Sequence, residues 1–582
     1  MVCGGENPEK ENQREEEENQ QEEKVSWSAY HANLKPHTES SQARVTQTSL
    51  LPLFHDQAHS AVMIRHSMDV VKKAVEILNP GQVPVIAMDQ PLYALAKQIQ
   101  WNWNTSHGEN QFVVMFGGLH IEMAALKALG TLLDGSGWTG AVVEANTASS
   151  GTADSFLHAS HVTRTRRAHQ ITASSLYILL KKAFLEYQGS LEDENAQLCF
   201  EDWCSNKSVH HPQFKFWFLV LQIELAIMIF IRAVREGIFQ LYIDALTNIV
   251  PWFFALDHLH YARWIPVHLR DMISLEKVNP TVFGEFKKGN FVVRKTARRF
   301  SAIAIDQAHE QNNAAVKGDG GGIGLTENPA ALRRWMVSGP EMARVIGEFQ
   351  MSTEKKKSTD FCHHEETKHV QKAFKRDVDC LAKTIEEYGN PFTENSSDLL
   401  VLDNRNIAEQ AVVDTVFQIE QLGQEQYDKY VRERLVIQNV HVSKPITKNN
   451  LPLFSRPSVK KKNKSSLQLA SLKSDCSLFS RLYVSSQVRG GNLDEFFEHE
   501  NQACPPALSQ NGEMRTTKKS DLVGCLEDLV PSKEETTVPN IQVSIVDGSA
   551  IVNMLRPGSA QTFLDYAQQV FLPYIVAQLH HA

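Results

Sequence analysis

The stretch PVIAMDQPLYALAKQIQWNWNTSHGENQFVVMFGGLHIEMAALKALGTLL, residues 84–133, sets the expectation for the fold. It contains two short apolar runs, residues 84–90 and 112–118, and a helical pattern follows each of them. Short apolar runs are typical of buried strands, and Pro91 suits the first turn of the helix that follows the first run. The order strand, helix, strand, helix at this spacing predicts a parallel α/β sheet.

The chain of 582 residues is too long for one core, so we expect several folded pieces. Composition and periodicity divide it into six predicted segments: a disordered acidic stretch (1–50), the first half of an α/β core (51–150), a helical insertion rich in aromatic residues (151–285), the second half of the core (286–345), a helical and linker region (346–535), and the start of a truncated α/β module (536–582).

The formal net charge is −9, and much of it comes from residues 1–24, which hold nine glutamates against three basic residues. The remainder is close to neutral and has no overall basic surface of the kind that binds nucleic acid. The eight cysteines form no CxxC pair and suggest no disulfide framework. We therefore expect an intracellular protein, in the nucleus or the cytoplasm.

The most apolar segment is FWFLVLQIELAIMIFI, residues 216–231. As a helix it would span about 24 Å, which is less than the hydrocarbon core of about 30 Å. Gln222 and Glu224 lie in its middle, and a central carboxylate is costly in lipid. We expect a helix buried in protein, and no membrane partner.

Three apolar runs end in an aspartate, at Asp89, Asp306 and Asp547. In open α/β sheets, ligands bind beyond the carboxyl ends of the strands. A carboxylate at that position can hold a divalent metal or act as a base. For each aspartate taken alone, capping of the next helix is the more common role.

A helical face after the second half of the core carries Asp306, Glu310 and Asn313 at intervals of four and three residues. Such oxygen ligands favour Mg²⁺ or Mn²⁺. Acidic residues near the start of a helix are also favoured by its macrodipole alone, so both interpretations stay open. His120, at the exit of the second strand, is a candidate ligand or base, although a packed histidine is the commoner outcome.

Three arginines in HVTRTRRAH, residues 161–169, form the strongest local basic patch: Arg164, Arg166 and Arg167. They are candidates for contacts to a phosphate backbone. Salt bridges on an exposed loop are an equal alternative. No phosphate-binding loop, zinc-protease, serine-hydrolase or kinase signature occurs in the chain.

Several long segments resemble a family of uncharacterised, repetitive, transposon-like open reading frames found in many copies in animal genomes. They include MDQPLYALAKQIQWNW, FVVMFGGLHIEMAALKALG, VPWFFALDHLHYARWIPVHL, IAIDQAHEQNNAAVKGDGGGIGLTENPAALRRW and DGSAIVNMLRPGSAQTF, and the resemblance extends over about residues 60 to 582. Members of that family continue beyond the last residue of this chain. The family has no established activity to carry over.

The layout is also similar to transposases with a ribonuclease-H-like fold, in which acids at strand ends and a glutamate on a later helix hold two metals. Asp89 matches the first acid, and Glu310 or Asp306 the last, whereas the second strand leads to His120 in place of an aspartate. This likeness implies an α/β, ribonuclease-H-like core split by the helical insertion.

We therefore expect a transposon-derived nuclease or transposase-like protein, active or degenerate, that acts on DNA with Mg²⁺ or Mn²⁺. Asp89 and Glu310 would be the metal ligands, Asp306 and His120 would support them, and the arginine patch would contact the DNA. The alternative is a non-catalytic scaffold that binds protein partners through its helical insertion.

Overall fold

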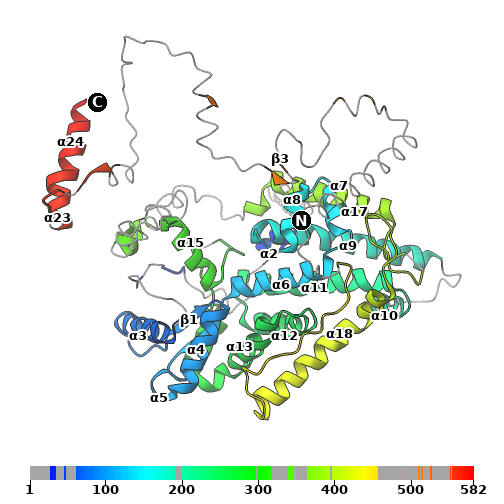
Figure 1. Ribbon diagram of the computed structural model, residues 1–582, viewed down its shortest axis with the longest axis horizontal. Coiled ribbons are helices and arrows are strands. Elements are labelled where there is room, and N and C mark those ends of the chain that lie inside the picture. Colours follow the sequence, from blue (N-terminus) through cyan, green and yellow to red (C-terminus); the bar gives the residue numbers. More distant parts are fainter. Residues whose placement is uncertain are drawn as a thin grey trace, which may run out of the picture. The chain divides into compact units, whose positions relative to one another are not determined.

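The protein is described from a computed structural model (Figure 1). The described residues are 26–34, 45–47, 51, 60–190, 199–317 without 297, 364–455 without 394–395, and parts of 338–348, 492–526 and 551–581. The chain divides into two compact units, residues 1–456 and 457–582, and each is considered by itself.

The first unit contains the predicted pair of parallel strands. β1 (Val85–Met88) pairs with β2 (Val113–Phe116), so that the two strands begin and end side by side. α4 (Gln90–Asn102) connects them, with the short α5 (Asn104–His107) before β2, and α6 (Gly118–Leu133) follows β2. The strand–helix–strand–helix order predicted from residues 84–133 is confirmed, and α3 (Ala61–Leu78) precedes it.

The prediction of a ribonuclease-H-like α/β fold is wrong, because the fold is mainly helical. Among the described residues the parallel sheet has two strands, β1 and β2. The segments around 290–306 that were expected to add strands form a single antiparallel bridge with each other, between Val293 and Ile303. They pair with each other and do not extend the sheet, and the chain turns into a helix at Ile305. The predicted strand at 541–547 lies outside the described residues.

Helices make up the rest of the first unit. Those after α6 are α7 (Trp138–Glu144), α8 (Ser150–Leu157), α9 (Val162–Gly189), α10 (Phe200–His210), α11 (Pro212–Glu236), α12 (Phe239–Ala255), α13 (Leu259–Val278), α14 (Pro280–Lys287), α15 (Ile305–Lys317), α17 (Lys368–Tyr388) and α18 (Gln410–Tyr430). The short turns η2 (His364–Glu366) and η3 (Val431–Val436) flank the last two helices.

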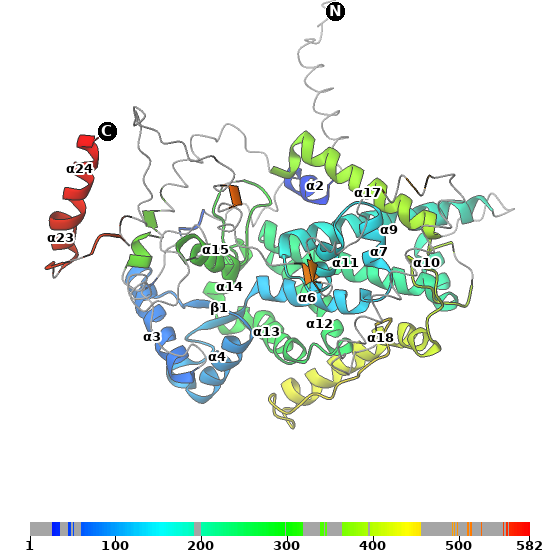
Figure 2. The same cartoon turned by 45° about the horizontal axis from the view of Figure 1, so that its top comes forward.

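α11 forms the centre of the helical core. It contacts α6, α9, α10, α12 and α18, and Figure 2 shows it among α6, α9 and α12. Trp217, Val220 and Leu219 on this helix are fully buried, as are Phe253 and Leu246 on α12. By length and composition α11 is the one helix among the described residues that could cross a membrane, and 67% of its apolar window is buried inside the fold.

Two segments that are far apart in sequence meet at the strand pair. α15 contacts both β1 and α6, so the chain returns to residues 85–133 after the long run of helices α7–α14 (Figure 1). Near the other end of the unit, α2 (Trp27–Asn33) lies within the stretch for which disorder was predicted. The backbone N–H of Ser26 donates to Gln371 on α17 at 2.8 Å, which fixes this short helix.

The second unit has little regular structure among its described residues. β3 (Ser509–Gln510) and β4 (Glu513–Met514) form a two-residue antiparallel ladder. α23 (Phe563–Tyr566), the π-helical turn η4 (Ala567–Phe571) and α24 (Leu572–His581) form one continuous helical stretch.

Candidate functional site

The carboxylate of Asp306 connects α15 to the start of α6. Its oxygens accept the backbone N–H groups of Leu119 at 3.1 Å and His120 at 3.2 Å. The Nδ1 atom of His120 lies 2.9 Å from Oδ2 of the same carboxylate. Because a carboxylate only accepts hydrogen bonds, Nδ1 carries the proton and donates it. The Nε2 atom is the remaining reactive position of His120, whose side chain is 28% exposed.

Two glycines allow α15 to approach this closely. A Cβ atom on Gly117 would lie 2.3 Å from Oδ2 of Asp306 and 3.1 Å from the carbonyl oxygen of Met88. A Cβ atom on Gly118 would lie 2.9 Å from the Cβ of Ala304. Any larger residue at these positions would force α15 away from the strand ends. The GG pair of FVVMFGG is therefore required by packing around the Asp306 carboxylate.

Asp89 lies at the carboxyl end of β1, as predicted, and caps α4. Its Oδ1 accepts the backbone N–H of Leu92 at 3.2 Å, so the capping alternative is confirmed for this aspartate. Its side chain is half-buried. The capping bond does not remove Asp89 from the site, because its charge acts on His120.

Three carboxylates favour the protonated form of His120. The hydrogen bond that His120 donates to Asp306 is the largest influence that raises its pKa, and the charges of Asp306, Asp89 and Glu310 raise it further, against the opposing effect of burial. Tyr261 on α13 lies near the same group: burial raises its pKa first, and the charges of Asp89 and Asp306 add to this. The site thus combines residues from β1, α6, α13 and α15.

The predicted face of α15 is only partly directed at this cluster. Asp306 is buried, whereas Glu310 is exposed and Asn313 is half-buried. The Nδ2 atom of Asn313 lies 3.0 Å from Nε2 of His309 on the same helix. Asp306 does not end a strand: it lies in the first turn of α15, where a carboxylate is favoured by the macrodipole.

A metal would need ligands beyond those that this cluster holds together. Within the part of the chain that the structure describes, no group of three or more histidine, cysteine, aspartate or glutamate side chains is arranged to hold a metal ion. Asp306 is committed to three protein donors. Asp89 and Glu310 are the two carboxylates that remain for a cation, and Mg²⁺ is commonly held by one or two carboxylates together with waters and substrate phosphates.

The arginine patch is divided by the fold. Arg166 pairs with Glu122 through two hydrogen bonds of 2.8 Å, and Arg167 pairs with Asp377 at 3.0 Å. Both guanidinium groups thereby fix α9 to neighbouring helices. Arg164 is exposed in the first turn of α9 and is the member that faces solvent.

Tyr261 and the two glycines were not singled out from the sequence. Tyr261 lies in a helical stretch with many aromatic residues, and its spacing does not separate it from the packed ones. The glycine pair gives a readable signal, because two glycines directly after a buried strand often indicate a close backbone approach.

Comparison with known proteins places the chain in a family but assigns no activity. No curated protein and no solved structure matches it. Residues 26–202 and 194–500 match a family model described as a domain of unknown function, DUF8702. Because the two matched ranges cover most of the chain, this protein belongs to the DUF8702 family.

Proposed function

We propose that this protein hydrolyses phosphodiester bonds in DNA at the His120 cluster, with a divalent cation. The observation that carries the proposal is the convergence of three carboxylate charges on one histidine from two distant parts of the sequence, the end of β1 and the start of α15. Asp89, Asp306 and Glu310 all raise the pKa of His120. Perturbed titrating groups of this kind are concentrated at functional sites.

In the proposed reaction His120 acts as general acid. Water attacks the phosphorus and releases one proton to solvent, the bond to the leaving strand oxygen breaks, and that oxygen takes the proton from Nε2 of the imidazolium, which solvent then reprotonates. The raised pKa suits this role, because it extends the protonated form toward neutral pH. Asp306 is a positioning residue, since its carboxylate fixes the ring through Nδ1.

Asp89 and Glu310 are proposed to hold the cation, Mg²⁺ or Mn²⁺, together with the substrate phosphate. Such a cation stabilises the charge that develops on the phosphate oxygens. Arg164 supplies an exposed positive charge for the strand. DNA as substrate and a transposon origin follow from the sequence resemblance and stay predictions.

The first test is calorimetric titration of Mn²⁺ and Mg²⁺ into the full chain, with a phosphorothioate oligonucleotide present as the phosphate source. We expect Asp89→Ala and Glu310→Ala each to weaken binding by about tenfold or more, equivalent to about 1.4 kcal/mol. Glu276→Gln, an exposed carboxylate on α13, is the matched control and should bind as wild type. The metal site is refuted when the wild type binds neither cation, or when all three variants bind alike.

The second test separates the acid role of His120 from a structural one. The rate at which labelled DNA is cleaved should fall as pH rises through the pKa of His120. Asp306→Asn removes the carboxylate that most raises the pKa of His120. The alkaline limb of the pH–rate profile should therefore move to lower pH. An unchanged limb in this variant would contradict the assignment.

A non-catalytic scaffold is the second candidate, and one observation favours it. The carboxylates of Asp89 and Asp306 each accept backbone N–H groups at the start of a helix, which is a structural role. Under this alternative Asp89→Ala loses about 1 kcal/mol of stability, as a lost cap does, while the chain binds no cation at all.

A further inference from the structure

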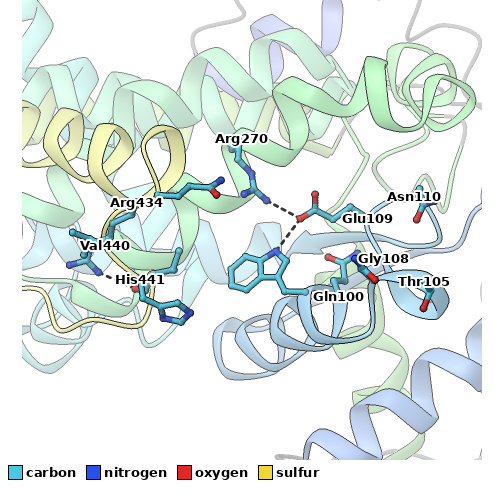
Figure 3. Close-up of a pocket in the computed structure, with 13 residues that line it drawn as sticks. Gln100, Thr105, Gly108, Glu109, Asn110, Arg270, Arg434, Val440 and His441 are labelled. Atoms are coloured by element: carbon cyan, nitrogen blue, oxygen red, sulfur yellow. Dashed lines mark hydrogen bonds and ion pairs between the residues drawn. The ribbon is translucent and has the colours of Figure 1, made fainter.

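A second hollow lies at the opposite ends of the two strands from His120. An open pocket of about 880 Å³ is bordered by the end of α4, the α5 turn and residues 108–110, which precede β2. Its other wall comes from Arg270 on α13 and from Arg434 to Val442, on η3 and the loop after it. Figure 3 shows Arg434 and His441 on one side of the pocket, and Gln100 and Thr105 on the other. The volume is that of a site for a small organic molecule.

The wall on the α4 side is rigid and carries an aromatic ring. The indole of Trp101 stacks against Trp264 at a centroid distance of 6.0 Å. Its Nε1 donates to Glu109 at 3.3 Å, and Glu109 also accepts from Arg270 at 2.9 Å (Figure 3). Lys97 donates to the same carboxylate at 2.7 Å. The ring is therefore held in place before any ligand arrives, which lowers the entropy cost of binding.

The opposite wall offers donors for an anion. Nδ1 of His441 accepts the backbone N–H of Ser443 at 3.2 Å, so Nε2 of the neutral ring carries the proton. The Nη1 atom of Arg434 donates to the carbonyl oxygens of Val442 and Lys444 at 3.0 and 2.7 Å, and Nη2 donates to that of Pro445 at 3.4 Å, which fixes the side chain. Within the described residues its Nε makes no hydrogen bond and stays available as a donor.

Positive charge exceeds negative charge around this wall. The ring of Tyr430 lies beneath Arg434, and three cations act to lower the pKa of its hydroxyl group, against the larger effect of burial: Arg434, Arg263 and Arg270. The Nε atom of Arg263 is buried and has no hydrogen-bond partner. Burial lowers the pKa of Arg434 and the charge of Arg263 lowers it further, while Tyr430 and Glu433 act in the opposite direction. An anion placed here would relieve this repulsion between cations.

We propose that this pocket binds a nucleoside monophosphate, with its phosphate on Arg434 and His441 and its base against Trp101. The exposed amide group of Asn104 lines the pocket on the α4 side and suits the polar edge of a base. The same chemistry is present in a free mononucleotide and in the terminal nucleotide of a strand. The site is separate from the His120 cluster and does not depend on the proposed catalysis.

The test is calorimetric titration of the full chain with the four nucleoside 5′-monophosphates, the nucleosides, inorganic phosphate and a 5′-phosphorylated hexanucleotide. We expect at least one monophosphate to bind with a Kd below about 1 mM, and its nucleoside and phosphate alone to bind at least about tenfold more weakly. Tighter binding of the hexanucleotide than of every monophosphate would assign the site to a strand end, and the reverse order to a free nucleotide.

Thr105→Trp supplies a variant that keeps all the charges. Thr105 is exposed and lines the pocket, so an indole there fills the space without removing a donor. Thr163→Trp, exposed in the first turn of α9 and outside the pocket, is the matched control. Binding should weaken at least about tenfold in the first variant only. The proposal is overturned when no monophosphate binds to the wild type, when phosphate binds as tightly as the nucleotide, or when both tryptophan variants bind like the wild type.

Discussion

Replacement of Gly117 by alanine tests the contact on which the His120 cluster depends. The added Cβ would lie 2.3 Å from Oδ2 and 2.8 Å from Cγ of Asp306. The φ angle of Gly117 is −59°, which alanine adopts without strain, so the effect comes from the clash and not from the backbone. To restore an ordinary contact, the carboxylate must move by about 1 Å, which takes its hydrogen bonds out of range.

The magnitude follows from the bonds that Asp306 would lose. It accepts two backbone N–H groups and the Nδ1–H of His120. Hydrogen bonds to a charged group contribute about 1.5–3 kcal/mol each, and water replaces part of this because His120 is partly exposed. We expect Gly117→Ala to lower the free energy of unfolding by about 2–4 kcal/mol. The pKa of His120 should fall as well, because its largest raising influence is removed.

Two measurements check this expectation: urea unfolding followed by tryptophan fluorescence, and titration of His120 by NMR. Gly284→Ala is the control, since Gly284 lies inside α14 and a Cβ there would meet nothing within 4 Å. That change should stabilise the protein by about 0.5–1 kcal/mol. If Gly117→Ala behaves like the control and leaves the pKa of His120 unchanged, the close approach of Asp306 has no energetic consequence and the reasoning fails.

Three other substitutions probe buried charges in the first unit. Lys97→Met removes a cation that is 1% exposed and leaves Asp271, its partner at 2.7 Å, with Arg270 as its remaining cation, so urea unfolding should show a loss of about 3 kcal/mol. Arg166→Lys keeps the charge but cannot make the two-bond contact with Glu122, and should cost about 1–2 kcal/mol in the same assay. Burial raises the pKa of Glu224, so the neutral carboxyl is compatible with the fold below pH 4.5, and stability is lost as pH rises and the group ionises. Glu224→Gln should therefore match the Tm of the wild type near pH 4.5 and have the higher Tm at pH 8.

Local patterns in the sequence were sufficient to predict the elements around the site. The apolar runs at 84–90 and 112–118 are strands because they are short, contain valine and isoleucine, and pack against helices. The helices that follow them begin where proline, aspartate and glycine favour it. These signals act over a few residues, so they do not depend on how the rest of the chain folds.

The overall fold could not be predicted in this way. The segment FSAIAID has the composition of a strand, yet a strand forms only where a partner edge is available. Here the nearest partner of Ile303 is Val293, ten residues earlier, and the two make a single bridge. Glu122 was likewise not predictable as the partner of Arg166, because that contact joins α6 to α9 through tertiary packing.

A two-stranded sheet is nevertheless enough to assemble this cluster. β1 and β2 are parallel and in register, so the residues that follow Met88 and Phe116 lie at the same edge. In a larger sheet a third strand would bring the next acid to that edge. Here the N-terminal turn of α15 does so, because the glycines at 117 and 118 let it reach the strand ends and Asp306 closes the contact. The proximity of Asp89, His120 and Asp306 therefore depends on one strand pair and one helix terminus, and the error in the predicted fold does not remove it.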